Sequence, residues 1–212
     1  IGLLIGLLLG GIRDVRIEER DAPVSRIIKK ILHGFVGLYV WIFRGTPMMV
    51  QALIIYHGLR PVLNWSPVTA GITIISINTG AYMAEIIRAG IQSIDKGQNE
   101  AARSLGMTST QTMMSIILPQ AIRNSFPSIG NEFIVNIKDS SMLNVIGVIE
   151  LYFQSSSVAG SLMLYVPTFI VAAILYLLLT TLATQLLSFV EGRMNMPRSS
   201  GPSSQSVPVE RV

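Results

Sequence analysis

Two stretches of this sequence contain no charged residue, and each is long enough for a helix to cross a lipid bilayer. They run from residue 61 to residue 84 and from residue 151 to residue 190. A membrane-spanning helix needs about 20 mostly apolar residues, because it rises about 1.5 Å per residue through a hydrocarbon core roughly 30 Å thick. Charged residues make up only 13% of the chain, about half the share found in soluble domains. The sequence therefore predicts an all-α membrane protein.

Two further crossings are expected in the first third of the chain. The opening run IGLLIGLLLGGI would cover only about 18 Å as a helix, and we expect that the beginning of this helix is missing from the sequence. The break RGT at residues 44 to 46 separates two apolar runs that are each too short to cross alone. We expect an amphipathic helix over residues 24 to 43 along the membrane surface, followed by a span that starts near Pro47.

The second half of the chain is expected to supply the last two of about five crossings. One span is predicted from about residue 115 to residue 137, and Pro119 and Pro127 inside it predict kinks or a broken helix. The charge-free run after it begins with the polar sequence SSSVAGS, which favours a re-entrant or extracytoplasmic connection. The final crossing is therefore expected at about residues 162 to 190.

The basic residues indicate which side of the membrane each loop occupies. With five crossings, 14 of the 16 Lys and Arg residues fall on one side, in residues 13 to 30, at Arg44, in residues 85 to 123 and in the tail. The positive-inside rule assigns that side to the cytoplasm. We expect the N-terminus outside, one transmembrane domain over residues 1 to 192, and a Ser/Pro-rich disordered cytoplasmic tail over residues 193 to 212.

Several function classes are excluded by residues that the chain lacks. It has no cysteine and only two histidines, His33 and His57, so we expect no metal site and no cofactor. No basic stripe with interleaved aromatic residues is present, which argues against nucleic acid as a partner. The phosphate-binding pattern G-x-x-x-x-G-K-[ST] is missing, so the chain is not expected to be an enzyme that hydrolyses ATP by that route.

A polar segment at about residues 95 to 112, between the third and fourth crossings, is predicted to form a short cytoplasmic helix. Asn99 is a suitable N-cap, EAARSL is rich in helix formers, and Gly106 is suited to the position past the C-terminus. TSTQ has the capping-box spacing that starts another helix. Isolated helices this short are marginal in water, so the segment packs either against a partner or, as a simple connector, against its own bundle.

The spacing of this segment carries a family resemblance. Glu-Ala-Ala at residues 100 to 102, then Gly106, Ile116, Leu118 and Pro119, reproduces the pattern EAA-x3-G-x9-I-x-LP. That pattern resembles the signature of permease subunits of ATP-binding-cassette importers. The stretches FRGTPMMVQ, NTGAYMAEIIRAGIQSIDKGQ and LPQAIRNSFPSIGNEFIVNIKDSSMLNVIGVIEL are similar to the polar-amino-acid branch of these permeases, and the resemblance covers roughly residues 24 to 190.

The resemblance implies a multi-pass subunit with the type I importer fold in a bacterial inner membrane. It also implies a separate ATPase, a second permease subunit that is either identical or different, an extracytoplasmic binding protein or domain, and an amino-acid substrate. In the family, the short cytoplasmic helix docks in a cleft of the ATPase. Carried over, the coupling residues are Gly97, Glu100, Ala101, Ala102, Arg103 and Gly106. Glu100 also suits a helix N-terminus without any partner, and Arg103 also suits contact with lipid headgroups.

Polar residues inside the predicted spans are candidates for the substrate pathway, because such residues are costly at membrane depth. An amino acid needs an acid for its ammonium group, hydrogen-bond donors, and a cation for its carboxylate. The candidates are Asn78, Thr79, Tyr82, Glu85, Glu132, Lys138 and Asp139. The alternatives are that Lys138 and Asp139 form a solvated pair at the outer interface, that Glu85 lies at the cytoplasmic boundary, and that polar groups join helices to each other.

Three functions remain open from the sequence. The first is the permease subunit of an ATP-driven amino-acid importer. The second is a self-sufficient secondary transporter or channel for small polar solutes, which would transport alone in liposomes with an ion gradient. The third is a membrane scaffold, which would transport nothing in any combination.

Overall fold

A computed structural model describes residues 1 to 14 and 22 to 193, and this part of the chain is helical with no strand. In chain order the elements are α1 (Gly2–Asp14), α2 (Pro23–Gly45), α3 (Met48–Leu63), α4 (Pro67–Gln92), α5 (Lys96–Ser104), α6 (Ser109–Thr112), the π-helix η1 (Met113–Ile117), α7 (Leu118–Asp139), the 3₁₀-helix η2 (Ser140–Ile146), α8 (Leu151–Leu162) and α9 (Tyr165–Arg193). The all-α prediction is confirmed. The predicted disordered tail, apart from Arg193, lies outside the described residues.

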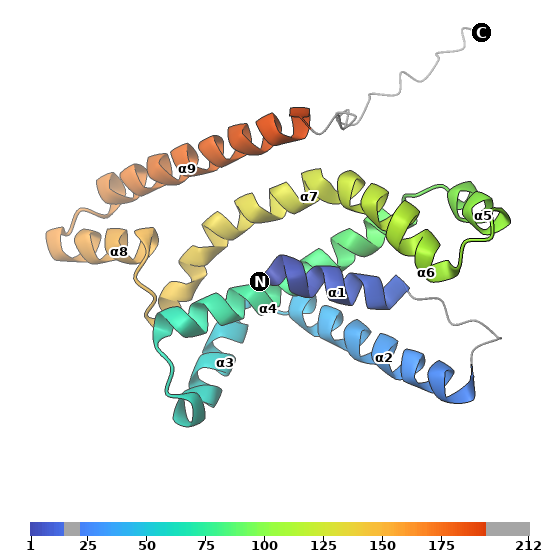
Figure 1. The fold of residues 1–212 in the computed structure, drawn as a ribbon. Coiled ribbons are helices and arrows are strands. Elements are labelled where there is room, and N and C mark those ends of the chain that lie inside the picture. Colours follow the sequence, from blue (N-terminus) through green and yellow to red (C-terminus); the bar gives the residue numbers. More distant parts are fainter. Residues whose placement is uncertain (15–21, 194–212) are drawn as a thin grey trace, which may run out of the picture.

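The helix α4 is the centre of the fold. Its start is fixed by Ser66, whose hydroxyl accepts a hydrogen bond from the Thr69 backbone N–H at 3.1 Å, and by Pro67 in the first turn. Helices α1, α2, α3 and α7 all pack against α4. Figure 1 shows α5 and α6 at one end of the molecule and α3 and α8 at the opposite end. This arrangement separates the predicted cytoplasmic segment from the predicted outer connections.

Glycines bring α1 unusually close to α4. A Cβ atom built on Gly2 would lie 2.8 Å from the Cβ of Thr79, and one built on Gly10 would lie 2.9 Å from the Ala84 carbonyl oxygen. A Cβ on Gly6, between them, would overlap Met83. Small residues at a spacing of four allow helix backbones to approach closely in membranes. The contacts advance along both helices together, so α1 and α4 run in the same direction, as two outside-to-inside crossings must.

The chain bends by 112° between α2 and α3. The break lies beside Asn78, near the middle of α4, where the Asn78 side chain donates a hydrogen bond to the Phe43 carbonyl oxygen. Val36 and Val40 of α2 are buried against Ala84. The second half of α2 is therefore packed on α4, and its position along the membrane surface remains a prediction. The sequence counted Arg44 with the basic residues of the cytoplasmic side, and here its side chain is exposed beside the Tyr82 ring.

Within the described residues, two helices, α4 and α9, are long and apolar enough to cross a membrane, and the bent pair α2 and α3 adds a third candidate. Helix α1 is apolar but short, as expected from the sequence. Helix α7 spans 22 residues, long enough to cross, but its polar composition keeps it out of this set. The fold thus contains the five predicted segments, and the number of actual crossings remains a prediction.

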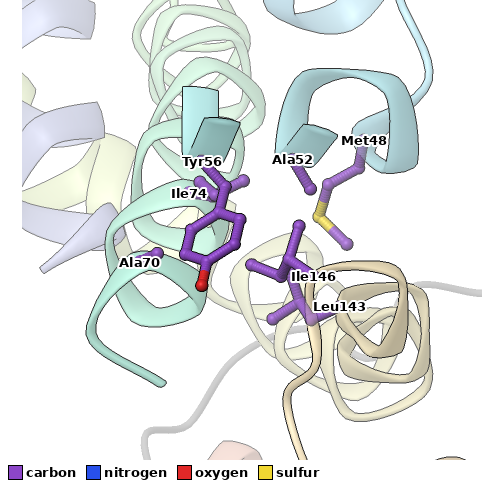
Figure 2. Close-up of a cluster of buried hydrophobic side chains, with 7 residues drawn as sticks. All are labelled: Met48, Ala52, Tyr56, Ala70, Ile74, Leu143 and Ile146. Carbon is purple, nitrogen blue, oxygen red and sulfur yellow. The ribbon is translucent and has the colours of Figure 1, made fainter. Parts of the chain in front are cut away.

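Apolar clusters hold each end of the bundle together. Figure 2 shows Met48, Ala52 and Tyr56 of α3 against Ala70 and Ile74 of α4 and against Leu143 and Ile146 of η2. At the opposite end, Ile87 and Ile91 of α4 pack against Ile117 and Ala121. Because α4 contributes to both clusters, it ties the α3 end of the molecule rigidly to the segment that carries α5.

The last two helices form a loosely attached arm. Glu150 caps α8 by accepting hydrogen bonds from the Tyr152 and Phe153 backbone N–H groups at 2.8 and 2.7 Å. The connection SSSVAGS is part of α8, and α9 follows it after a short turn, close to the predicted boundary at residue 162. Helix α9 packs only partly on α7 and α8, and 6% of its apolar window is buried.

Candidate functional site

The predicted cytoplasmic helix is present as α5, with its start earlier than expected. The N-cap is Asp95, whose carboxylate accepts a hydrogen bond from the Gly97 backbone N–H at 2.7 Å. Asn99 was the predicted cap and lies inside the helix instead. The sequence offered two acceptable caps four residues apart, and the earlier one allows an additional turn of helix to form.

The end of α5 follows the prediction. Gly106 adopts φ +82°, a left-handed conformation that favours glycine. Its N–H donates to the Arg103 carbonyl oxygen, and the Met107 N–H donates to the Ala102 carbonyl oxygen, which together form a Schellman motif. Thr108 and Gln111 then complete the capping box of α6. The short helix α5 is therefore fixed at both ends by its own sequence.

Helix α5 presents most of the predicted coupling residues outward. Ala102 is buried against its own chain, whereas Gly97, Glu100, Ala101, Arg103 and Gly106 are exposed. The Arg103 guanidinium donates to the Ser109 hydroxyl at 2.9 Å, so this residue also braces the turn to α6. Leu105 was missed by the sequence analysis and is 84% exposed. An apolar side chain so exposed at the end of a polar helix is suited to contact with another protein.

Two of the predicted pathway residues hold helices together. The Asn78 amide donates to Gln51 Oε1 at 2.9 Å, and Gln51 in turn donates to the carbonyl oxygens of Phe43 and Thr46 at 3.0 and 2.9 Å. These bonds satisfy carbonyl groups that the end of α2 leaves unpaired. Thr79 donates to Asn136 Oδ1 of α7 at 2.9 Å. Both residues therefore fix the geometry of the bend and of the α4–α7 contact.

A cluster of charges lies next to these contacts. The Arg44 guanidinium is 5.5 Å from the centre of the Tyr82 ring, a cation–π arrangement. Glu85 pairs with Arg13 at 2.8 Å and also with Arg88. A cavity of about 440 Å³ opens here, lined by Arg13, Gly37, Val40, Trp41, Arg44, Gly45, Tyr82 and Glu85. The sequence analysis did not place Arg44 in the pathway, because it counted this residue only among the basic residues of the cytoplasmic side.

The acidic residues of α7 extend this cluster. The positive charge of Arg44 acts on both Glu85 and Glu132, which places Glu132 on the same side of the molecule as the cavity. Asp139 lies two turns further along α7, where its charge acts on Glu132 and is itself opposed by Lys138. Lys138 is exposed. Tyr82 and Glu85 therefore line the cavity together with Arg44, whereas Glu132 lies on α7 outside the cavity lining and Lys138 and Asp139 lie at the η2 end of α7.

Helix α7 also carries an exposed polar face that the sequence analysis did not identify. Residues spaced by three and four positions share one side of a helix. On this side, Gln120, Asn124, Ser128, Asn131 and Lys138 are all exposed. The face extends for about 27 Å at 1.5 Å per residue, nearly the thickness of a hydrocarbon core. The spacing of these polar residues by three and four positions is visible in the sequence. Only the exposed fractions of the side chains separate this face from the side of α7 that packs on α4, where Ser125 and Gly130 are buried.

Comparison with known proteins gives consistent matches along almost the whole chain. Residues 2–196 match the family model described as "Binding-protein-dependent transport system inner membrane component". The chain is 37% identical to the "Probable amino-acid permease protein YxeN" of Bacillus subtilis (strain 168), over 93% of this chain and 87% of that protein. It is 35% identical to the glutamine transport system permease protein of Escherichia coli (strain K12), over 92% and 85% of the two chains.

A solved structure described as an amino acid ABC transporter with histidines is also similar. It superposes with a TM-score of 0.76 and 41% sequence identity, and the match covers 91% of this chain and 86% of the other. The likeness therefore includes the helix arrangement as well as the sequence.

Proposed function

The chain belongs to the family of binding-protein-dependent transport system inner membrane components, and from this premise we propose that it is the permease subunit of an ATP-driven amino-acid importer. The observation that carries the proposal is α5, a short helix with fixed ends that exposes Glu100 and Ala101 of the Glu-Ala-Ala signature at one end of a membrane bundle. The proposed partners are a separate ATPase, a second permease subunit and an extracytoplasmic substrate-binding protein.

In this proposal α5 is the surface on which the ATPase docks. Glu100 offers an exposed charge, Ala101 allows close approach, and Leu105 offers an apolar contact. Ala102 faces inward and anchors the helix to the rest of the chain. Since α5 packs against η1 and α6, a displacement imposed on it is passed to α7.

The docking proposal is tested with Glu100→Lys and with Gly106→Leu, in the complex with the ATPase. Each is expected to lower co-purification of the ATPase and to reduce uptake about ten-fold, the effect of losing ~1.4 kcal/mol of interaction. Glu191→Lys, near the end of α9, makes the same charge change away from α5 and is the matched control. Unchanged uptake and unchanged ATPase binding in both α5 variants would reject the docking surface.

We further propose that the cluster around Arg44 and the polar face of α7 line the path of the solute. An amino acid carries a carboxylate, which suits Arg44, and an ammonium group, which suits Glu132. The long polar face supports this assignment, because exposed amide and hydroxyl groups are costly against lipid and favourable against water. The pathway would then lie between this chain and the second permease subunit.

The pathway proposal is tested with Glu132→Gln and Asp139→Asn, which keep size and remove charge. Uptake is expected to fall while the ATPase still co-purifies, because neither residue lies near α5. Normal uptake by both variants would remove these two acids from the pathway. A secondary transporter, the competing function, would instead take up solute as the purified chain alone in liposomes with an ion gradient.

A further inference from the structure

The π-helix η1 joins the proposed docking segment to α7. It covers Met113–Ile117, and at its end the Leu118 backbone N–H donates to the Met113 carbonyl oxygen, five residues earlier. An α-helix would instead bond to the residue four positions earlier. Single π turns inside helices are rare and are concentrated at functional sites.

Pro119 accounts for the position of this wide turn. Proline has no backbone N–H, and in a regular α-helix its ring would collide with the carbonyl group four residues earlier, here that of Ser115. Widening the preceding turn relieves that collision. The Gln120 side-chain amide adds a hydrogen bond to the Ile116 carbonyl oxygen at 2.8 Å, inside the widened turn. The π register is therefore supported by the two residues that follow Leu118.

Thr112, the residue just before η1, disfavours the π register that Pro119 and Gln120 favour. Thr112 is 2% exposed, and its hydroxyl has no hydrogen-bond partner within the part of the chain that the structure describes. Other helical threonines of this chain donate to the carbonyl oxygen four residues earlier; Thr73, Thr180 and Thr184 do so at 2.9, 2.9 and 2.7 Å. A buried hydroxyl without a partner is costly. The conformation described here thus leaves one group unsatisfied at the start of the π turn.

Packing connects this turn to both proposed functional regions. Helix α5 contacts η1 directly. Met113 and Ile116 of η1 pack on the cluster of Ile87, Ile91, Ile117 and Ala121, which holds α7 to α4. A force applied to α5 therefore reaches α7 through the π turn.

Resting on the proposed function, we propose that η1 is a hinge with two hydrogen-bond registers. The π register is the one described here. Displacement of α5 by the ATPase shifts the turn toward the α register, which rotates Thr112 relative to α7 and takes its hydroxyl out of the buried position where it has no partner. A change of one residue in register turns one helix against the other by about 100° and moves it by about 1.5 Å. The hinge would convert a push on α5 into a rotation of the polar face of α7.

Two substitutions in the assembled complex with its ATPase test the hinge, because they bias the two registers in opposite directions. Thr112→Val keeps the side-chain shape and removes the unsatisfied hydroxyl, so it favours the π register. Pro119→Ala removes the ring and restores an N–H, so it favours the α register. Basal ATP hydrolysis is expected to fall about five-fold or more in Thr112→Val, the factor that follows from a small penalty for an unsatisfied buried group, and to rise in Pro119→Ala.

Thermal stability gives a readout that does not depend on transport. Thr112→Val is expected to unfold at the same or a higher temperature than the unmodified complex. Thr73→Val, which loses the 2.9 Å bond to Thr69, is the matched control and is expected to unfold at a lower temperature. The hinge is rejected if Thr112→Val lowers the unfolding temperature as Thr73→Val does, or if both hinge variants shift ATP hydrolysis in the same direction or not at all. If the unmodified complex binds no ATPase and transports nothing, the proposed function fails instead.

Discussion

Helices α7 and α9 are the two long elements of the second half of the chain, and both expose much of their surface in the single subunit. On α9 the exposed side chains are mostly apolar, its mean hydropathy reaches 2.2, and no charge occurs before Glu191. On α7 one exposed side is a column of amide, hydroxyl and ammonium groups, and Phe133 is exposed on another side. The exposed surfaces of the two helices are therefore suited to different surroundings. Lipid can cover α9 on nearly every side, whereas the polar face of α7 requires water or another subunit.

The contrast also separates the roles of packing and exposure. Helix α7 uses its buried side, with Ala121 and Ser125, to hold α4. Helix α9 touches α7 only in part, for example where Leu187 lies against Gly130. We infer that α9 serves mainly as a membrane anchor, while α7 couples the bundle to the pathway. Substitutions that exchange the character of the two exposed faces test this distinction.

The largest effect is expected from an arginine placed in the middle of each helix. Leu178 is 54% exposed near the centre of α9, and Leu178→Arg would bring a charge into lipid at a cost of about 2.5 to 3.5 kcal/mol. Ser128, near the centre of α7, lies on the polar face, so Ser128→Arg is expected to insert normally. The amount of folded protein in the membrane measures both. Equal losses for the two variants would mean that α7 also faces lipid.

A smaller effect is expected when the polar face is made apolar. Asn131→Leu leaves every described hydrogen bond in place, because the described contacts do not involve its side chain. Uptake is expected to fall about ten-fold while the unfolding temperature stays unchanged or rises, since binding or passage of the solute loses roughly 1.4 kcal/mol. Leu182→Ala on α9 is the control, and its uptake should match that of the unmodified protein. Full uptake by Asn131→Leu would exclude this residue from the pathway.

The smallest effect is expected from removing a hydrogen bond between α9 and Glu150, the residue that caps α8. The Tyr176 hydroxyl donates to Glu150 Oε2 at 2.8 Å. Tyr176→Phe should lower the free energy of unfolding by about 1 kcal/mol, the typical net contribution of a hydrogen bond between half-buried groups, and leave uptake intact. Calorimetry of the complex measures the first effect. A loss of uptake without a loss of stability would give α9 a role beyond anchoring.

Much of the fold was predictable because the length and the ends of a membrane helix depend on residues that are close together in the sequence. The charge-free runs predicted α4 and α9, and the capping residues Thr108 and Gln111 predicted the start of α6. Gly106 correctly predicted the end of α5, because the residue that follows the helix adopts a left-handed backbone conformation that favours glycine. These features depend on residues that are neighbours in the chain.

The parts that sequence reasoning missed depend on contacts between distant residues. Arg44 lies beside Tyr82 because α2 packs on α4, which no local pattern reveals. Asn78 was a pathway candidate with helix joining as its alternative, and only the structure shows that Gln51, 27 positions away, accepts a hydrogen bond from its amide. The polar face of α7 became visible only when exposure separated it from the buried side. The roles of the proposed coupling and pathway residues remain predictions.

The reactivity of cysteines placed on the two exposed helix faces tests directly whether the α7 face contacts water and the α9 face contacts lipid. The chain contains no native cysteine, so single substitutions Ser128→Cys and Leu178→Cys in the complete complex report on one position each. A membrane-impermeant maleimide should label the Ser128→Cys variant, with the rate changing when ATP is added, and should leave the Leu178→Cys variant unlabelled. If both variants resist labelling with and without ATP, the polar face of α7 does not line a water-filled pathway and the central claim is wrong.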